Sequence, residues 1–202
     1  MTALDIPGKH SGERPPITQD RRLALIHQFL TDQRIDLRTR VAGCLLLLYA
    51  QPVTRLSQLT LDDIITGDDG QVSIRLGSPP TPVPEPFAAM LTELAANRAN
   101  MKTAVNPGCQ WLFPGQRAGL PLIPLRLRRQ LHELGIPVSQ ARTASFRQLV
   151  LQAPSPVVAR ALGYDYGTAA EHAIAEGATW NRHPAGRSGS PAAPPNRAGP
   201  GR

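Results

Sequence analysis

A run of apolar residues between positions 37 and 50 constrains the fold of this chain more than any other feature. It reads LRTRVAGCLLLLYA, and its apolar residues go beyond the single stripe of Leu37, Val41, Leu45 and Leu48. Asp36 is placed to cap this helix at its start, and Pro52 ends it. We therefore expect a helix that the rest of the fold buries nearly all round.

Other segments repeat apolar residues at helical spacing and predict further helices. The first begins near Thr18 or Asp20, either of which is a suitable cap. A later one ends at Gly135 and turns Leu127, Leu131 and Leu134 inward. The predicted helices cover residues 18–30, 54–59, 85–99, 124–135, 143–153, 155–163 and 168–177.

A short stretch between these helices changes to the alternating period of a β-strand. QVSIRLG at 71–77 follows the turn residues Asp68, Asp69 and Gly70, and the proline-broken TPVPE at 81–85 suits only an edge strand. The order of helices, strands and helices predicts a mostly α fold with a small antiparallel β-sheet insertion.

The two ends of the chain differ in composition from the middle. Residues 1–17 and 183–202 consist largely of proline, glycine, serine and arginine, with little to bury. We expect one folded domain over residues 18–182 and an unstructured tail at each end.

The balance of charge suggests a polyanionic partner. The net charge is +7, and Lys9 and Lys102 are the only lysines among 22 basic residues. Arginine binds phosphate in a bidentate manner that lysine cannot match, although codon bias also raises arginine content. Nucleic acid is favoured over a membrane, because no basic amphipathic helix carries an aromatic belt.

The remaining composition excludes several classes of protein. Cys44 and Cys109 are far apart and have no neighbouring metal-ligand spacing, so we expect neither a disulfide nor a metal site. No apolar leader begins the chain, and the run at 41–50 is too short to span a bilayer. A cytoplasmic protein without a small-molecule cofactor is expected.

Three groups of residues carry a family resemblance. RLSQL at 55–59 is followed by LDDI at 61–64 and the predicted hairpin. The stretch ASFRQLVLQAPSPVVARALGY, residues 144–164, then places an arginine on an apolar helix and ends the next helix with Leu-Gly. This succession resembles the catalytic domain of the tyrosine recombinases, the phage-integrase family, over residues 37–177. The resemblance implies that family's fold and its activity of cutting and rejoining DNA.

The resemblance also assigns positions in the active site. Arg55 and Arg147 match the two arginines of the family. Ala144 and Tyr164 replace the two histidines, and Ala173 replaces the nucleophilic tyrosine. The hairpin lacks the family's lysine, and Arg75 is its nearest cation.

The chemistry of the family shows what these losses mean. A tyrosine hydroxyl attacks the DNA phosphodiester, two arginines hold the phosphate oxygens, and histidine and lysine transfer protons. Without the nucleophile, Arg55 and Arg147 would bind phosphate without turnover. Two alternatives stay open: these arginines could instead pair with Asp62 or Asp63 as a brace, or Tyr164 or Tyr166 could serve as a displaced nucleophile.

Arginines on the helix at 124–135 are candidates for further DNA contacts. Arg126, Arg128 and Arg129 could line DNA or form a solvated face, whereas Trp111 and Phe113 are expected in the core. Only residues 18–36 precede the matched region, so binding to double-stranded DNA should be weak and salt-dependent.

The leading hypothesis is therefore a catalytically degenerate, recombinase-like DNA-binding protein, with self-association left open. The alternative of a different class is an interaction module that keeps the fold without DNA binding. The placement of the arginines separates the two hypotheses. DNA binding would be favoured if one concave face gathered Arg55, Arg75, Arg147 and the arginines at 126–129.

Overall fold

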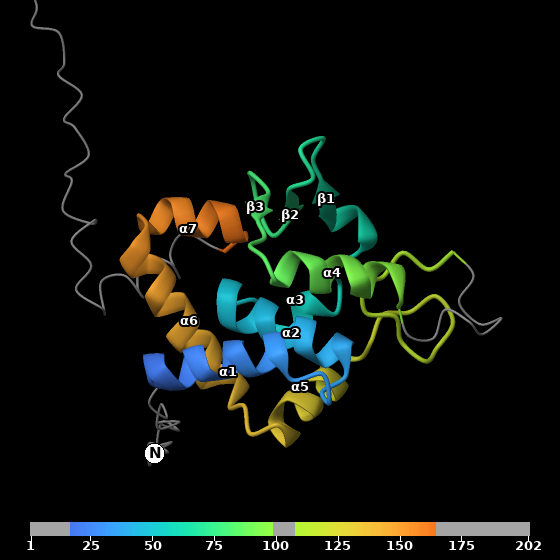
Figure 1. The fold of residues 1–202 in the computed structure, drawn as a ribbon, viewed down its shortest axis with the longest axis horizontal. Helices are drawn as coiled ribbons and strands as arrows, with labels where there is room; N and C mark the ends of the chain where they lie inside the picture. The colour runs from blue at the N-terminus through green and yellow to red at the C-terminus, as the bar shows by residue number, and fades with distance from the viewer. Residues whose placement is uncertain (1–16, 99–107, 165–202) are drawn as a thin grey trace, which may run out of the picture.

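A buried central helix organises the structure. The computed structural model describes residues 17–98 and 108–164, and Figure 1 shows helix α2 (Leu37–Tyr49) in their middle. Every residue from Val41 to Leu47 is buried, which confirms the expectation from the sequence. The side chain of Asp36 accepts a hydrogen bond from the amide of Thr39 at 3.3 Å, so the predicted cap is also confirmed.

The other helices cover α2 from several directions. Helices α1 (Gln19–Thr31), α4 (Phe87–Ala96), α5 (Pro124–Glu133) and α6 (Val138–Gln152) all contact it. The short helix α3 (Val53–Leu56) follows it after Pro52, and α7 (Ser155–Leu162) packs beside α6. The core between them is made mainly of leucine, valine and alanine.

A small sheet lies at one end of this helical layer. A 3₁₀ turn (Leu61–Asp63) leads into β1 (Ile64–Thr66), which pairs antiparallel with β2 (Val72–Ile74). Strand β3 (Thr81–Pro82) pairs antiparallel with β2 at the edge, as the prolines predicted. The expected mostly α fold with an antiparallel β insertion is confirmed.

Helix α6 begins earlier than the sequence suggested. Thr143 was expected near its start, but the helix begins at Val138, after Pro137. The hydroxyl of Thr143 donates to the carbonyl of Ser139 at 3.1 Å, one turn back, so it is satisfied inside the helix and caps nothing. The predicted helix at 168–177 and both tails lie outside the described residues, and the domain boundaries at 18 and 182 stay predictions.

A glycine in α2 allows α1 to approach closely. A Cβ atom on Gly43 would lie 2.3 Å from Cε2 of Phe29, a ring that is only 1% exposed. Arg40, one turn earlier, donates from Nε to the carbonyl of Phe29 at 2.7 Å and from Nη2 to that of Leu30 at 2.8 Å. The same short stretch of α2 therefore both seats Phe29 and closes the end of α1.

The two aromatic residues expected in the core have different surroundings. Phe113 is fully buried, which confirms the expectation. Trp111 is half-buried, and its indole N–H donates to the carbonyl of Gly119 at 2.9 Å.

Replacing Gly43 with alanine tests this packing. Helix propensity alone predicts a gain of about 1 kcal/mol in the free energy of unfolding. Because the ring of Phe29 has no room to move, we expect a loss of about 1–3 kcal/mol in urea denaturation. The double variant Gly43→Ala/Phe29→Leu should lose less than the two single changes added together. A stabilising Gly43→Ala change would contradict this packing.

Candidate functional site

Arg55 joins three segments that are far apart in the sequence. Its Nη1 atom donates to the carbonyls of Leu162 at 2.9 Å and Gly163 at 3.0 Å, at the end of α7. Its Nη2 atom donates to the carbonyl of Leu76, just after β2. The partners of Arg55 are thus main-chain carbonyls, whereas Asp63 accepts from the amide and hydroxyl of Thr60 at 2.8 and 2.9 Å.

The carbonyl end of α7 is bound by the rest of the fold. A helix leaves its last four carbonyls without partners in the helix. Here the amide of Ser78 donates to the carbonyl of Arg160 at 2.9 Å, and the hydroxyl of Thr81 donates to that of Ala161 at 3.1 Å. The amide group of Gln51 adds a bond of 3.2 Å to Leu162, beside that of Arg55. Each carbonyl from Arg160 to Gly163 therefore has a donor from outside α7.

Glycine is required where α7 meets the hairpin. Gly163 has φ = 64°, and a Cβ there would lie 2.4 Å from the carbonyl oxygen of Leu76. A Cβ on Gly77 would lie 2.1 Å from the carbonyl oxygen of Arg160. The Leu-Gly pair in the sequence thus marks a close approach of two backbones.

Tyr164 is held from several directions. Its hydroxyl donates to the carbonyl of Ala50, the left-handed residue that ends α2. The ring meets Phe146 edge to face at 4.8 Å between centroids, and Nε of Arg142 lies 3.4 Å from the hydroxyl and 3.1 Å from the carbonyl of Ala50. Burial raises the pKa of Tyr164, and the hydrogen bond from Arg142 opposes this in part. The phenol is therefore a neutral structural donor in this structure.

Helix α6 places its arginines in different surroundings. Ala144 is buried and Arg147 is half-buried. Arg142 and Phe146, four residues apart, share the helix face that contacts Tyr164, whereas Arg147 lies about 140° around the helix from Arg142. The contact of Arg142 with Tyr164 was not predicted from the sequence. The only indication there was the spacing of four residues between Arg142 and Phe146.

The other predicted contact residues are exposed at separate places. Arg75 follows β2, and its side chain donates to the carbonyl of Asp62 at 3.1 Å. Arg126, Arg128 and Arg129 are exposed on α5, where Arg129 pairs with Glu133 at 2.9 Å. The strands and α5 lie at opposite ends of Figure 1, so these arginines do not form one cluster.

Several arginines bind the protein's own main chain. Buried Arg22 donates from Nε to the carbonyl of Leu47 at 2.9 Å, and Arg98 donates to that of Trp111 at 3.1 Å. Together with the carbonyl bonds of Arg40, Arg55 and Arg142, these contacts give part of the basic charge an internal role. Net charge therefore overstates the arginine surface available to a polyanion.

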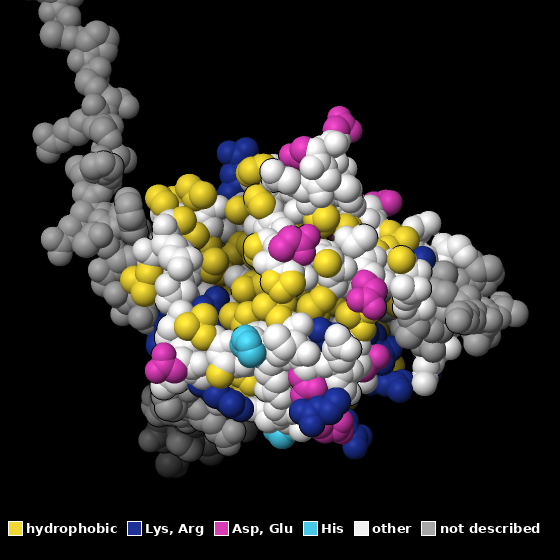
Figure 2. All heavy atoms as spheres, in the orientation of Figure 1, with side chains coloured by type: hydrophobic (Ala, Val, Ile, Leu, Met, Phe, Trp, Pro, Cys, Tyr) yellow, Lys and Arg dark blue, Asp and Glu magenta, His cyan; other side chains and the backbone are white. Residues whose placement is uncertain are grey.

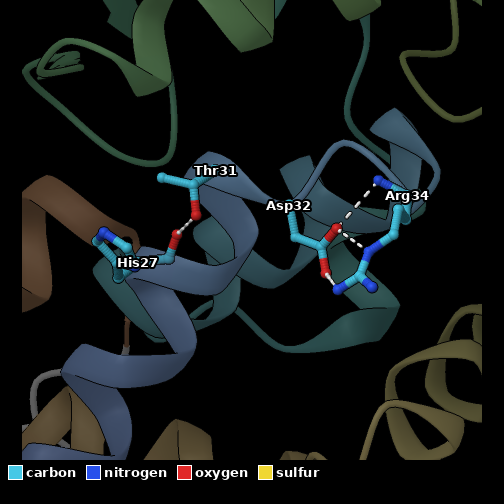
Figure 3. Close-up of polar contacts among 4 residues, drawn as sticks. All are labelled: His27, Thr31, Asp32 and Arg34. Atoms are coloured by element: carbon cyan, nitrogen blue, oxygen red, sulfur yellow. Dashed lines mark hydrogen bonds and ion pairs between the residues drawn. The ribbon is translucent and has the colours of Figure 1, made fainter.

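An ion pair between exposed Arg34 and half-buried Asp32 lies in the loop between α1 and α2. Figure 3 shows Arg34 facing Asp32, with Nε and Nη2 each 2.8 Å from a carboxylate oxygen. In the last turn of α1, directly before this pair, the hydroxyl of Thr31 donates to the carbonyl of His27 at 2.8 Å. The hydrogen bonds from Arg34 lower the pKa of Asp32 to about 2. A shallow hollow of about 500 Å³ lies beside this pair and reaches Glu133 of α5.

The described residues give no sign of a metal centre or a membrane span. Within residues 17–98 and 108–164, no group of three or more His, Cys, Asp or Glu side chains is placed to hold a metal ion. Across the same ranges, every helix falls short of the length and apolar character that a membrane span requires. Cys44 and Cys109 are both buried free thiols.

The fold has a counterpart among solved structures. No family model matches the sequence, and no curated protein is similar to it. The structure is similar to the crystal structure of the XerA recombinase, with a TM-score of 0.59 and 16% sequence identity over 89% of this chain and 67% of that chain. The chain thus has a recombinase-like fold. At this identity the likeness shows the fold alone, and Tyr166 and Ala173 lie outside the described residues.

The environment of Tyr164 predicts a loss of stability at high pH. Its pKa in the folded state is above the ordinary value of about 10, so the neutral phenol stabilises the fold fully below that pH. As the pH rises past 10, the unfolded phenol ionises first, and the free energy of unfolding falls. Tyr164→Phe should make this fall shallower in urea denaturation at several pH values. An unchanged slope would mean that Tyr164 titrates alike in both states.

The pair of Asp32 and Arg34 predicts a measurable acid titration. Carboxyl NMR shifts should give a pKa of about 2 for Asp32. Arg34→Ala should move this pKa up towards the ordinary value of about 3.9, because the hydrogen bonds that favour the charged form are lost. A pKa of Asp32 that is the same in the unmodified protein and in Arg34→Ala would contradict the pairing.

Proposed function

We propose that this chain is a recombinase-fold protein that binds double-stranded DNA without cutting it. One observation supports the absence of DNA cleavage. The hydroxyl of Tyr164 donates to the carbonyl of Ala50, and its pKa is raised. A nucleophilic tyrosine needs a free hydroxyl that can lose its proton. Alanine at position 173, where the family has its nucleophile, provides no hydroxyl.

The proposed phosphate contacts begin at the two arginines that the resemblance assigns. Arg55 uses three of the five N–H donors of a guanidinium on carbonyls, which leaves two for a phosphate among the described contacts. Its bonds to the main chain hold it in place before any ligand arrives. Arg147 would supply the second contact, and exposed Arg75, Arg126, Arg128 and Arg129 would meet the duplex elsewhere.

The arrangement of charge supports weak binding. Figure 2 shows that hydrophobic side chains occupy the middle of one face, while the described arginines visible there are scattered and do not gather into one patch. Scattered phosphate contacts position a protein on DNA and carry no sequence information. Binding should therefore be modest, salt-dependent and similar on all sequences.

A second candidate is an interaction module on the same fold that does not bind DNA. The observation in its favour is that Arg22, Arg40, Arg98 and Arg142 bond main-chain carbonyls. Arginines used in this way add to the net charge without forming a surface for DNA.

A salt series separates the two candidates. In fluorescence anisotropy with a labelled duplex of roughly 30 base pairs, the affinity should fall steeply as salt is added, because each neutralised phosphate releases counterions. Arg75→Gln, Arg128→Gln and Arg147→Gln should each reduce the slope of log affinity against log salt by about one. The control Arg21→Gln, an exposed arginine of α1, should leave it unchanged. Absence of binding at low salt would favour the interaction module.

The proposal also predicts that no covalent adduct forms. Incubation with nicked suicide duplexes, which trap phosphotyrosine links, should give no band shift in a denaturing gel. Ala173→Tyr should not restore an adduct, because Ala144 and Tyr164 replace the two histidines and catalytic groups that act as a unit fail together. An adduct on the unmodified protein, mapped by mass spectrometry to Tyr164 or Tyr166, would instead make the chain an active recombinase.

A further inference from the structure

Three large hydrophobic side chains are exposed together where the chain enters α5. Leu120, Ile123 and Leu125 are 51%, 61% and 72% exposed. They line two adjoining hollows of about 300 and 550 Å³, which share Ile123 and Arg126. Single exposed hydrophobic residues are ordinary, but three around joined hollows form a surface that can receive a partner.

The local structure holds these side chains outward. Leu122, between the β-bridge residue Pro121 and the extended Ile123, is 2% exposed, and its amide donates to the carbonyl of Phe113 at 2.8 Å. Successive side chains of an extended segment point in opposite directions, so Ile123 faces out. Leu127 is fully buried, and Leu125 lies about 200° from it around the helix. Both outward residues are therefore fixed by buried neighbours.

Arginines surround the apolar residues. Arg117 and Arg126 line the smaller hollow, and Arg126 and Arg129 line the larger one. The one carboxylate in these two linings belongs to Glu133, which pairs with Arg129 at 2.9 Å. We call Arg117, Leu120, Ile123, Leu125, Arg126 and Arg129 the α5 surface. It combines an apolar centre with a net positive rim.

We propose that the α5 surface docks an acidic amphipathic helix of a partner protein. The centres of protein–protein interfaces are apolar and rich in arginine, whereas protein–DNA interfaces are more polar and mostly contact phosphate and sugar. Phosphates offer nothing to the side chains of Leu120, Ile123 and Leu125. A helix with apolar anchors on one face and glutamates beside them matches both the hollows and the arginines. Arg128 lies in neither hollow, so DNA binding through it is independent of this docking, whereas Arg126 and Arg129 would contact either the helix or DNA at one time.

Two synthetic helical peptides test the proposal on the full chain. Each is roughly 16 residues long and carries leucine at positions i, i+3, i+4 and i+7. Most of the other positions are glutamate in the first peptide and lysine in the second. Fluorescence anisotropy should show binding of the glutamate peptide and none of the lysine peptide. Amide NMR shifts caused by the glutamate peptide should lie at residues 115–133.

Variants then separate docking from other uses of this surface. Ile123→Ser/Leu125→Ser should weaken binding of the glutamate peptide at least about tenfold, while Leu151→Ser, an exposed leucine of α6, should leave it unchanged. Equal binding of both peptides, or binding unaffected by the double change, would overturn the proposal. So would a loss of duplex binding in the double variant, which would make this a DNA surface. A dimer of the unmodified chain that the double change abolishes would instead make a second copy the occupant.

Discussion

The bonds between Arg55 and the end of α7 hold the candidate site together. Three N–H groups of one guanidinium reach the carbonyls of Leu162, Gly163 and Leu76. Bonds from a charged donor are stronger than neutral ones, and a helix end buried without donors would cost free energy for every unpaired carbonyl. This contact ties the end of α7 to the segment after β2, beside the bonds from Gln51 and Thr81 to the same helix end. Arg55 thus has a structural task that does not depend on any contact with phosphate.

The same use of arginine recurs across the fold and changes how the charge of the chain is understood. Arg40 closes the end of α1, Arg22 bonds the carbonyl of Leu47, and Arg142 bonds that of Ala50. A guanidinium suits this task because it carries several donors in a fixed plane. A basic composition is therefore compatible with a modest DNA-binding surface, and the surface has to be judged from the exposed arginines.

The sequence predicted those features whose causes are local. The buried helix at 37–50, its cap at Asp36 and the edge strand with its prolines all follow from periodicity and the chemistry of nearby residues. The partners of Arg55 could not be found in this way, because Leu162 lies 107 residues away and a carbonyl is present at every position. The early start of α6 was missed because the helix begins after Pro137, where no side chain makes a capping hydrogen bond. Arg142 was missed because its partner, the left-handed Ala50, has no signature in the sequence.

Hydrogen exchange in Arg55→Met tests the central claim most directly, with Arg75→Met as a matched loss of one exposed arginine. The amide of Ser78, bonded to the carbonyl of Arg160, and that of Tyr164, bonded to the carbonyl of Ala159, report on the end of α7. We predict that both amides exchange on the order of tenfold faster in Arg55→Met, while the amide of Arg40 in α2 keeps its rate. In Arg75→Met, the amides of Ser78, Tyr164 and Arg40 should all keep their rates. Unchanged protection of Ser78 and Tyr164 in Arg55→Met would show that α7 is held without Arg55.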